Sequence, residues 1–217
     1  MTLVAGTRAD VPTAAEASIR QFLAQQAPLP AYHAARRLEA ENGDRSGWLE
    51  ADTAYSAQRG FSYTITAQGG SGFVRERILK AVLDGERELI ARGNAGHGAL
   101  SLVNYTFDAA GIDAEGLANV LLSPRRRDDL LVAGTLFLRQ RSGDPVRLQG
   151  RLVKSPSFWV KNVDILWSYG KFDRATMPVA LHSSAEIRFF GPASLSVTYR
   201  YSEIAGHPVE RGLLSLP

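Results

Sequence analysis

The chain has 217 residues, a formal net charge of +3 and no cysteine. Hydrophobic residues make up 45% of it and charged residues 22%, values typical of a globular protein, and the length fits one all-β or α+β domain. The absence of cysteine excludes disulfides, thiolate nucleophiles and cysteine-based metal sites. The basic residues form no stripe or recognisable module, so nucleic acid is not an expected partner. No apolar run approaches the roughly 20 residues that a transmembrane helix requires.

The N-terminal part predicts an amphipathic helix followed by three strands. Thr13 and Glu16 have the spacing of a capping box, and the helix is expected over residues 13–27. From Tyr32 the apolar period changes to two, which indicates strands with one buried face. These three strands are expected at residues 32–41, 48–57 and 61–67, joined by short turns.

A second amphipathic helix is expected over residues 73–92. Its apolar stripe, at three- and four-residue spacing, includes one acidic residue and consists of Val74, Ile78, Leu79, Val82, Leu83, Glu86, Leu89 and Ile90. The preceding GGSG at residues 69–72 lacks the spacing of a Walker or dinucleotide-binding loop, so we interpret it as a flexible hinge. This helix should therefore cover one face of the sheet as a lid.

The C-terminal part predicts a meander with a large aromatic face. Residues 99–107 are typical of a strand or an apolar loop, and residues 112–120 of a short helix or a strand. Further strands are expected at residues 130–141, 146–154, 159–169, 185–189 and 195–201. The turns between the last three of these strands are expected to contain Gly170, Pro178 and Gly191-Pro192.

No motif for catalysis or metal binding is evident. The four histidines lack metal-ligand spacing, and we interpret His97, which lies between two glycines, as an exposed loop residue. Asp164 and Glu186 are expected on the strand face opposite the aromatics, as solvated partners of basic side chains rather than a general acid–base pair. The cluster at residues 125–129 (RRRDD) indicates a solvated loop or, alternatively, a docking site for an acidic partner or an anionic lipid headgroup.

The order of elements over residues 13–206 resembles the periplasmic LolA/LolB-like lipoprotein-carrier family, whose members sort lipoproteins to the outer membrane. The residue-level likeness lies within residues 147–206, where a strand leads to Met177-Pro178-Val179 and later strands end at Tyr199-Arg200-Tyr201. The resemblance implies an α+β, mainly β fold: a strongly curved antiparallel sheet forming an unclosed half-barrel, with two main helices covering its concave face. It also implies one domain over residues 1–217, with irregular tails at 1–12 and 208–217.

The function implied by the resemblance is that of a non-enzymatic carrier without a cofactor. Its partners would be a lipid or lipoprotein acyl chain and an envelope delivery or acceptor protein. The sequence begins without the regions of a signal peptide, so a periplasmic location assumes a leader that is absent from it, and a cytoplasmic location stays open. No single arginine can be matched to the cavity arginine of the carriers.

The aromatic face has two interpretations, a lipid-binding cavity or a filled core. In the first, the protein binds acyl chains; in the second, it is a periplasmic regulatory, sensor or scaffold module of the same fold. The side chains expected to line a cavity are Phe61, Tyr63, Ile65, Ile78, Val82, Leu83, Trp159, Val163, Ile165, Trp167, Phe189, Val197 and Tyr199.

Overall fold

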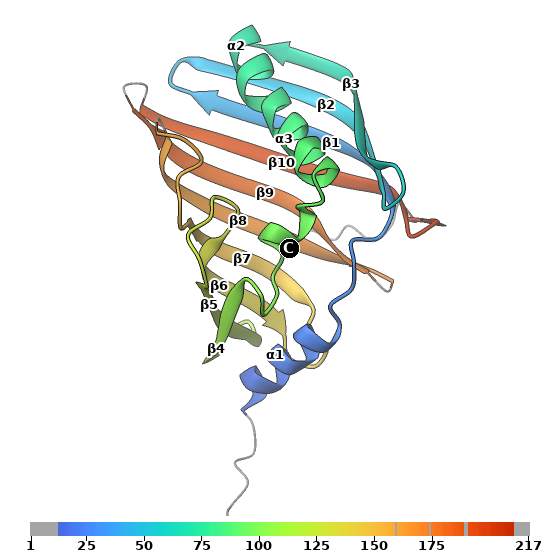
Figure 1. The fold of residues 1–217 in the computed structure, drawn as a ribbon, viewed down its shortest axis with the longest axis vertical. Helices are drawn as coiled ribbons and strands as arrows, with labels where there is room; N and C mark the ends of the chain where they lie inside the picture. The colour runs from blue at the N-terminus through green and yellow to red at the C-terminus, as the bar shows by residue number, and fades with distance from the viewer. Residues whose placement is uncertain (1–12, 159, 174, 189–190, 211–217) are drawn as a thin grey trace, which may run out of the picture.

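The computed structural model describes residues 13–158, 160–173, 175–188 and 191–210. Its strands form one antiparallel sheet in the order β3-β2-β1-β10-β9-β8-β7-β6-β5-β4. The first strand, β1 (Tyr32–Asn42), pairs with the last long strand, β10 (Gly191–Ile204), in the interior of the sheet. The edges are β3 (Gly60–Gly70) and β4 (Tyr105–Ile112), which do not pair with each other. The result is the expected half-barrel, curved and open (Figure 1).

The other strands are β2 (Arg45–Ser56), β5 (Leu117–Pro124), β6 (Val132–Arg139), β7 (Pro145–Leu152), β8 (Val160–Phe172), β9 (Ala175–Ile187) and the short β11 (His207–Pro208) on β10. The helical segments are α1 (Ala14–Ala24), α2 (Gly72–Val74), the π-helical η1 (Arg75–Leu79), α3 (Lys80–Ala91) and the 3₁₀ turn η2 (Ala95–Gly98).

Both predicted helices are confirmed, and they cover opposite ends of the concave face (Figure 1). The α1 helix begins with the predicted capping box: the Glu16 amide donates to Thr13 Oγ1 (3.3 Å), and the Thr13 amide to Glu16 Oε2 (2.7 Å). This helix packs on β4, β5 and β6. The continuous helical run α2–η1–α3 packs on β1, β2 and β3.

Each helix closes its own hydrophobic core. Under α1 the core includes Ile19 and Phe22 of the helix with Leu136 and Leu138 of β6. The core under α3 is formed by Val74, Leu79 and Leu83 of the helical run together with residues of β1, β2, β3 and β10. The half-buried Trp167 of β8 packs against both clusters. The middle of the sheet is therefore the junction between two separately closed ends.

Two choices left open by the sequence are resolved, and two predicted joints are wrong. Residues 99–104 are loop and turns before strand β4, and the choice at residues 112–120 is resolved as strand β5 after a turn. Gly170 and Pro178, predicted to be joints, lie inside β8 and β9, and the turn comes between them in the chain, from Phe172 to Ala175. Pro178 pairs with Tyr169 at a shift in register, where the interrupted ladder tolerates a residue without an amide hydrogen.

A glycine pair allows β6 and β7 to approach closely. Gly134 and Gly150 face each other across the two strands, and a Cβ atom at Gly134 would overlap the backbone of Gln149 and Gly150. A side chain at this point would push the strands apart, so both positions require glycine for steric reasons.

We predict that Gly134→Ala lowers the free energy of unfolding by about 2–3 kcal/mol, the cost of overpacking a filled position. The matched control is Gly85→Ala, because Gly85 lies in the exposed middle of α3 with nothing within 4 Å of an added Cβ. That change should stabilise the protein by about 1 kcal/mol through helix propensity. Urea unfolding measures both changes, and equal effects of the two substitutions would contradict the close approach of β6 and β7.

Candidate functional site

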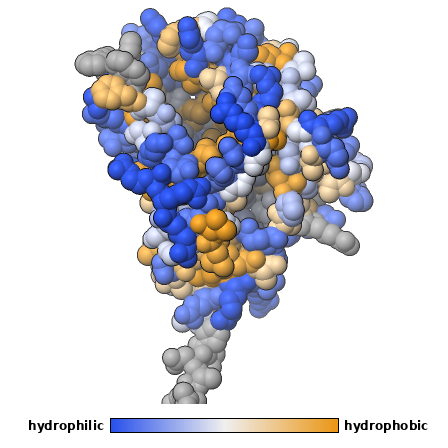
Figure 2. All heavy atoms as spheres, viewed as in Figure 1, coloured by the Kyte–Doolittle hydropathy of each residue, from blue (hydrophilic) through white to orange (hydrophobic). Residues whose placement is uncertain are grey.

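The candidate site is the concave surface of β8, β9 and β10 between the two helices. Its apolar side chains are half-buried, because neither helix covers them fully, and the set consists of Ile165, Trp167, Tyr169, Val179, Leu181 and Leu195. We call this set the central strip. The space-filling view shows a hollow beside α3 with hydrophobic atoms at its floor (Figure 2).

The structure places the predicted cavity residues in several different environments. Phe61, Leu83, Val197 and Tyr199 are buried in the core under α3, with exposed fractions of 5%, 0%, 1% and 8%. Four half-buried residues pack against the same core: Tyr63, Ile65, Ile78 and Val82. Ile165 and Trp167 belong to the central strip, and Val163 is buried outside both clusters. Trp159 and Phe189 lie outside the described residues.

A buried arginine is the chemically distinctive feature under α3. Arg36 is on the apolar face of β1 and only 4% exposed. Its guanidinium carbon lies 4.7 Å from the ring centre of Tyr199 and 4.9 Å from that of Phe61. Arg36 Nη1 and Nη2 donate to Glu86 Oε2 (2.5 Å) and Oε1 (3.0 Å) of α3, and Nη2 also donates to the Tyr32 hydroxyl (2.5 Å). Glu86 therefore connects α3 to the floor of the sheet.

The electrostatics of this group favour a charged arginine among neutral phenols. Burial by itself would lower the pKa of Arg36, but the hydrogen bond and the negative charge of Glu86 outweigh it and raise that pKa. Burial raises the pKa of Tyr199 to about 12 and also raises that of Tyr32, so both hydroxyls stay protonated at neutral pH. Arg36 Nε is buried without a hydrogen-bond partner. The guanidinium thus depends on Glu86 for its charge compensation.

A second polar contact holds α3 to the sheet at Asp84, two residues before Glu86. The Tyr63 hydroxyl of β3 donates to Asp84 Oδ1 (2.7 Å), and Arg87 pairs with the same oxygen (2.6 Å). Burial, followed by the hydrogen bond to Asp84, raises the pKa of Tyr63. This phenol therefore also remains a donor at neutral pH.

The expected hinge at residues 69–72 is wrong in part. Gly69 and Gly70 belong to β3 and pair with Trp48 and Gly47, and the Ser71 amide donates to Ser46 O (2.7 Å). A Cβ at Gly70 would lie 2.5 Å from that same oxygen, so this glycine serves close strand packing with a positive φ of 77°. The start of the helical run is consequently fixed to β2.

A pocket of about 750 Å³ opens beside the β8–β9 turn, where residues of both cores come together. It lies under the segment 25–30 that joins α1 to β1, and both Phe22 of the α1 core and Met177 of the α3 core line it. A buried polar group sits at its wall: Asp144 accepts from Lys171 Nζ (2.6 Å). The pocket adds a mainly apolar recess to the concave side.

The outer face of the sheet has different chemistry. A trough of about 740 Å³ there is lined by serines and charged residues of β1, β7, β8, β9 and β10, together with Ala133 and Leu166. Ile165 and Leu195 of the central strip also border it, because the sheet is a single layer. Asp164 is paired with Arg151 through two hydrogen bonds (2.8 and 3.0 Å), which lower the pKa of Asp164, and Glu186 accepts from Asn162 (3.0 Å). Each carboxylate thus has a structural partner of its own.

The described part of the chain contains no group of three or more His, Asp or Glu side chains arranged to hold a metal ion. Within the same residues, no helix combines the length and the apolar character needed to cross a membrane. His97 is exposed in η2, and its backbone carbonyl accepts from Arg126.

Sequence reasoning missed Arg36, although a signal was present. Arg36 is in phase with Tyr32, Leu38 and Ala40 on the apolar face of a strand with period two. Glu86 falls within the apolar stripe of the predicted helix. Two opposite charges on two apolar faces indicate a buried ion pair when those faces meet.

Comparison with protein-family models and with curated protein sequences finds no match. Solved structures with a similar chain course include a LolA superfamily protein from Nitrosomonas europaea, at 10% identity and a TM-score of 0.46, covering 94% of this chain and 99% of that one. A DUF1329 family protein from Desulfovibrio piger has 9% identity and a TM-score of 0.42, with 92% and 93% coverage. MucB has 10% identity, a TM-score of 0.27, and 92% and 94% coverage. These likenesses concern the course of the chain alone, and the half-barrel expected from the sequence is confirmed by the strand order of the sheet itself.

We predict that Glu86→Ala lowers the free energy of unfolding by about 3 kcal/mol, because it leaves Arg36 charged and buried without a partner. The matched control is Glu88→Ala, which removes an exposed i,i+4 pair with Arg92 on the same helix and should cost less than about 1 kcal/mol. The double variant Arg36→Met/Glu86→Leu should recover most of the loss. Urea unfolding gives all three values, and equal costs for Glu86→Ala and Glu88→Ala would show that the pair does not hold α3.

Proposed function

We propose that this protein is a non-enzymatic periplasmic binder or carrier of lipid or lipoprotein acyl chains. The observation that carries the proposal is the central strip: an apolar surface in the middle of an open sheet that neither α1 nor α3 covers completely. An apolar chain laid on this surface would remove both itself and the strip from water, at roughly 25 cal/mol per Å². An open, curved sheet cannot bury this face against itself, so an external apolar group completes it.

The two helices set where such a ligand fits. Trp167 touches both cores and therefore marks the point at which the ligand lies between α1 and α3. The recess between Phe22 and Met177 offers a continuation of the apolar path toward the opposite ends of the strands. A long acyl chain, which is narrow and flexible, matches this elongated surface.

The contacts of α3 give the site a mechanism of access. Opening the core under α3 breaks the Arg36–Glu86 and Tyr63–Asp84 contacts, both of which are polar and directional. Their loss would uncover the deeper residues Phe61, Leu83, Val197 and Tyr199. Arg36 then acts as a positioning residue that favours the closed helix, while the central strip provides the binding surface.

A second function, a regulatory or scaffold module with a filled core, is favoured by one observation. Phe61, Leu83, Val197 and Tyr199, all expected to line a cavity, are packed as an ordinary core beneath α3. In that case ligand binding is absent, and the functional surface is elsewhere on the molecule.

We predict that gently purified protein carries or takes up palmitate, detected by native mass spectrometry and by a change in tryptophan fluorescence. Ile165→Gln should weaken palmitate binding about tenfold or more, because it places an amide on the central strip. The control Leu121→Gln alters a 49%-exposed leucine on the outer face of β5 and should leave binding unchanged.

Two results decide between the functions. If the wild-type protein neither co-purifies with an apolar ligand nor binds palmitate, the carrier function is wrong and the filled-core module is favoured. If both glutamine variants bind like the wild type, the ligand does not lie on the central strip.

A further inference from the structure

Four segments line up at one end of the strands. They are the turns before β4 (residues 95–104), the β5–β6 loop (125–131), the β7–β8 loop (153–158) and Arg188 at the end of β9. Because neighbouring strands are antiparallel, every second connection emerges at the same end of the sheet. We call these residues the loop rim.

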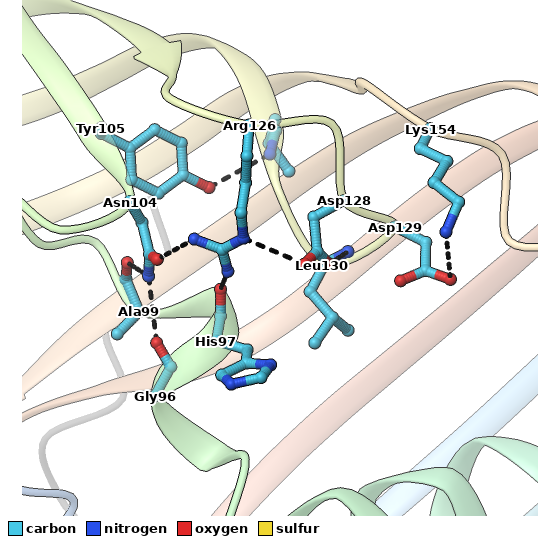
Figure 3. Close-up of polar contacts among 11 residues, drawn as sticks. Gly96, His97, Ala99, Asn104, Tyr105, Arg126, Asp128, Asp129, Leu130 and Lys154 are labelled. Carbon is cyan, nitrogen blue, oxygen red and sulfur yellow. Dashed lines mark hydrogen bonds and ion pairs between the residues drawn. The ribbon is translucent and has the colours of Figure 1, made fainter.

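Polar and ring contacts join the members of the loop rim one after another. Arg126 donates to His97 O (2.9 Å) and to Asn104 Oδ1 (2.5 Å), which ties the first segment to the β5–β6 loop (Figure 3). Lys154 pairs with Asp129 (3.9 Å) and so connects the β5–β6 and β7–β8 loops. The guanidinium of Arg188 lies 4.1 Å from the ring centre of Phe158. The loop rim is thus a continuous surface.

Asn104, which is only 2% exposed, makes several hydrogen bonds that hold the first segment of the loop rim. Its side-chain amide donates to Gly96 O (3.0 Å) and Ala99 O (2.7 Å), and its backbone carbonyl accepts from the Arg125 amide (2.8 Å). The neighbouring Tyr105 accepts from the Val132 amide through its hydroxyl (3.1 Å). The preceding turn is therefore held in a defined shape by side-chain bonds.

This braced turn displays aliphatic side chains to water instead of burying them. Val103 is 79% exposed and Leu102 57%, and Phe158 on the β7–β8 loop is 68% exposed. Leu130, which lies beside Gly98, is a further exposed apolar residue, at 37%. In Figure 2 a hydrophobic patch stands out on this side of the molecule, below the hollow beside α3. A fixed loop that exposes several large apolar groups fits an apolar partner surface.

The charge of the loop rim is positive. It contains five basic residues, Arg125, Arg126, Arg127, Lys154 and Arg188, and two acidic ones, Asp128 and Asp129. Both carboxylates are already engaged, Asp128 with Arg126 (3.2 Å) and Asp129 with Lys154. Within the described residues, Arg125, Arg127 and Arg188 form no ion pair with a carboxylate. Their excess charge complements an anionic surface.

We propose that the loop rim docks the protein on an anionic lipid bilayer. The guanidinium groups of Arg125, Arg127 and Arg188 contact lipid phosphates, while Leu102 and Val103 enter the boundary between headgroups and acyl chains. A bilayer combines, over one broad surface, the negative charge and the apolar layer that the loop rim matches. An acidic polypeptide would supply the charge but would leave the aliphatic tip exposed.

Flotation of the purified protein with vesicles tests the proposal. The wild type should bind vesicles of equimolar phosphatidylcholine and phosphatidylglycerol more tightly than vesicles of phosphatidylcholine alone, and added salt should weaken this binding. Arg127→Gln/Arg188→Gln should weaken it about 25-fold, at about fivefold for each cation removed near the surface. Leu102→Ser/Val103→Ser should also weaken it, and a soluble poly-glutamate peptide should bind less tightly than the anionic vesicles.

Matched controls come from the opposite end of the strands. Arg141→Gln removes an exposed arginine in the β6–β7 turn, and Ile112→Ser removes a 41%-exposed aliphatic residue at the end of β4. Neither should change vesicle binding. Flotation reports docking and native mass spectrometry reports palmitate uptake, so this proposal and the proposed carrier function can fail separately.

Three results would overturn the proposal. The first is equal binding to neutral and anionic vesicles, or none to either. The second is an equal loss from Arg141→Gln and from the loop-rim substitutions, which would reflect net charge alone. The third is tight poly-glutamate binding combined with no effect of Leu102→Ser/Val103→Ser, which would assign the surface to an acidic protein.

Discussion

The desolvation of Arg36 constrains the whole α3 side of the molecule. A guanidinium on the apolar face of a strand loses its water when a helix covers it, and this loss costs several kcal/mol unless a carboxylate replaces the water. Glu86 supplies that carboxylate, so the position of α3 is fixed along its axis as well as above the sheet. Apolar contacts from Leu79 and Leu83 favour burial of the helix but do not specify its register on the sheet, whereas the ion pair does.

The open sheet explains why two cores exist instead of one. The strands of a closed barrel would fill the interior with their own side chains, but here β3 and β4 remain separate edges. Each edge is therefore covered by its own helix, and the middle strands β8 to β10 are left between them. Trp167 bridges the two cores with a large ring, while its smaller neighbours Val179 and Leu181 leave the surface half-covered.

The elements with strong local signals were predictable from the sequence. The capping box at Thr13 and Glu16 placed α1, and the period-two alternation at residues 195–201 placed β10. The joints were harder to predict, because Pro178 and Gly170 are residue types typical of turns but lie inside paired strands, Pro178 at a shift in register. Only the pairing partner reveals that the ladder is already interrupted at Pro178.

The candidate site was less predictable than the fold for a physical reason. Alternation shows that Phe61 and Ile165 face the concave side, and helical spacing shows that Leu83 belongs to the apolar stripe of α3, but neither pattern shows which strand residues that helix covers. That depends on where α3 crosses the strands, and the crossing is set by Arg36 and Glu86, which belong to elements 50 residues apart. Consequently Phe61 and Leu83 are core residues in the closed structure, whereas Ile165 belongs to the central strip.

The attachment of α3 at both ends limits how it moves. Its N-terminal end follows the helical run that begins at Ser71, whose amide is bonded to β2, and its C-terminal end leads within a few residues to the turn that Asn104 and Arg126 hold. A helix tethered in this way does not swing out on one glycine hinge.

The π-helical η1 and the exposed Gly85 are the places where the backbone of this helical run deforms most easily. The hydrogen-bond ladder is irregular at η1, and a side chain is missing at Gly85. Access to the core under α3 therefore requires bending between two fixed ends. The ion pair of Glu86, which lies next to Gly85, is the contact that such bending strains first.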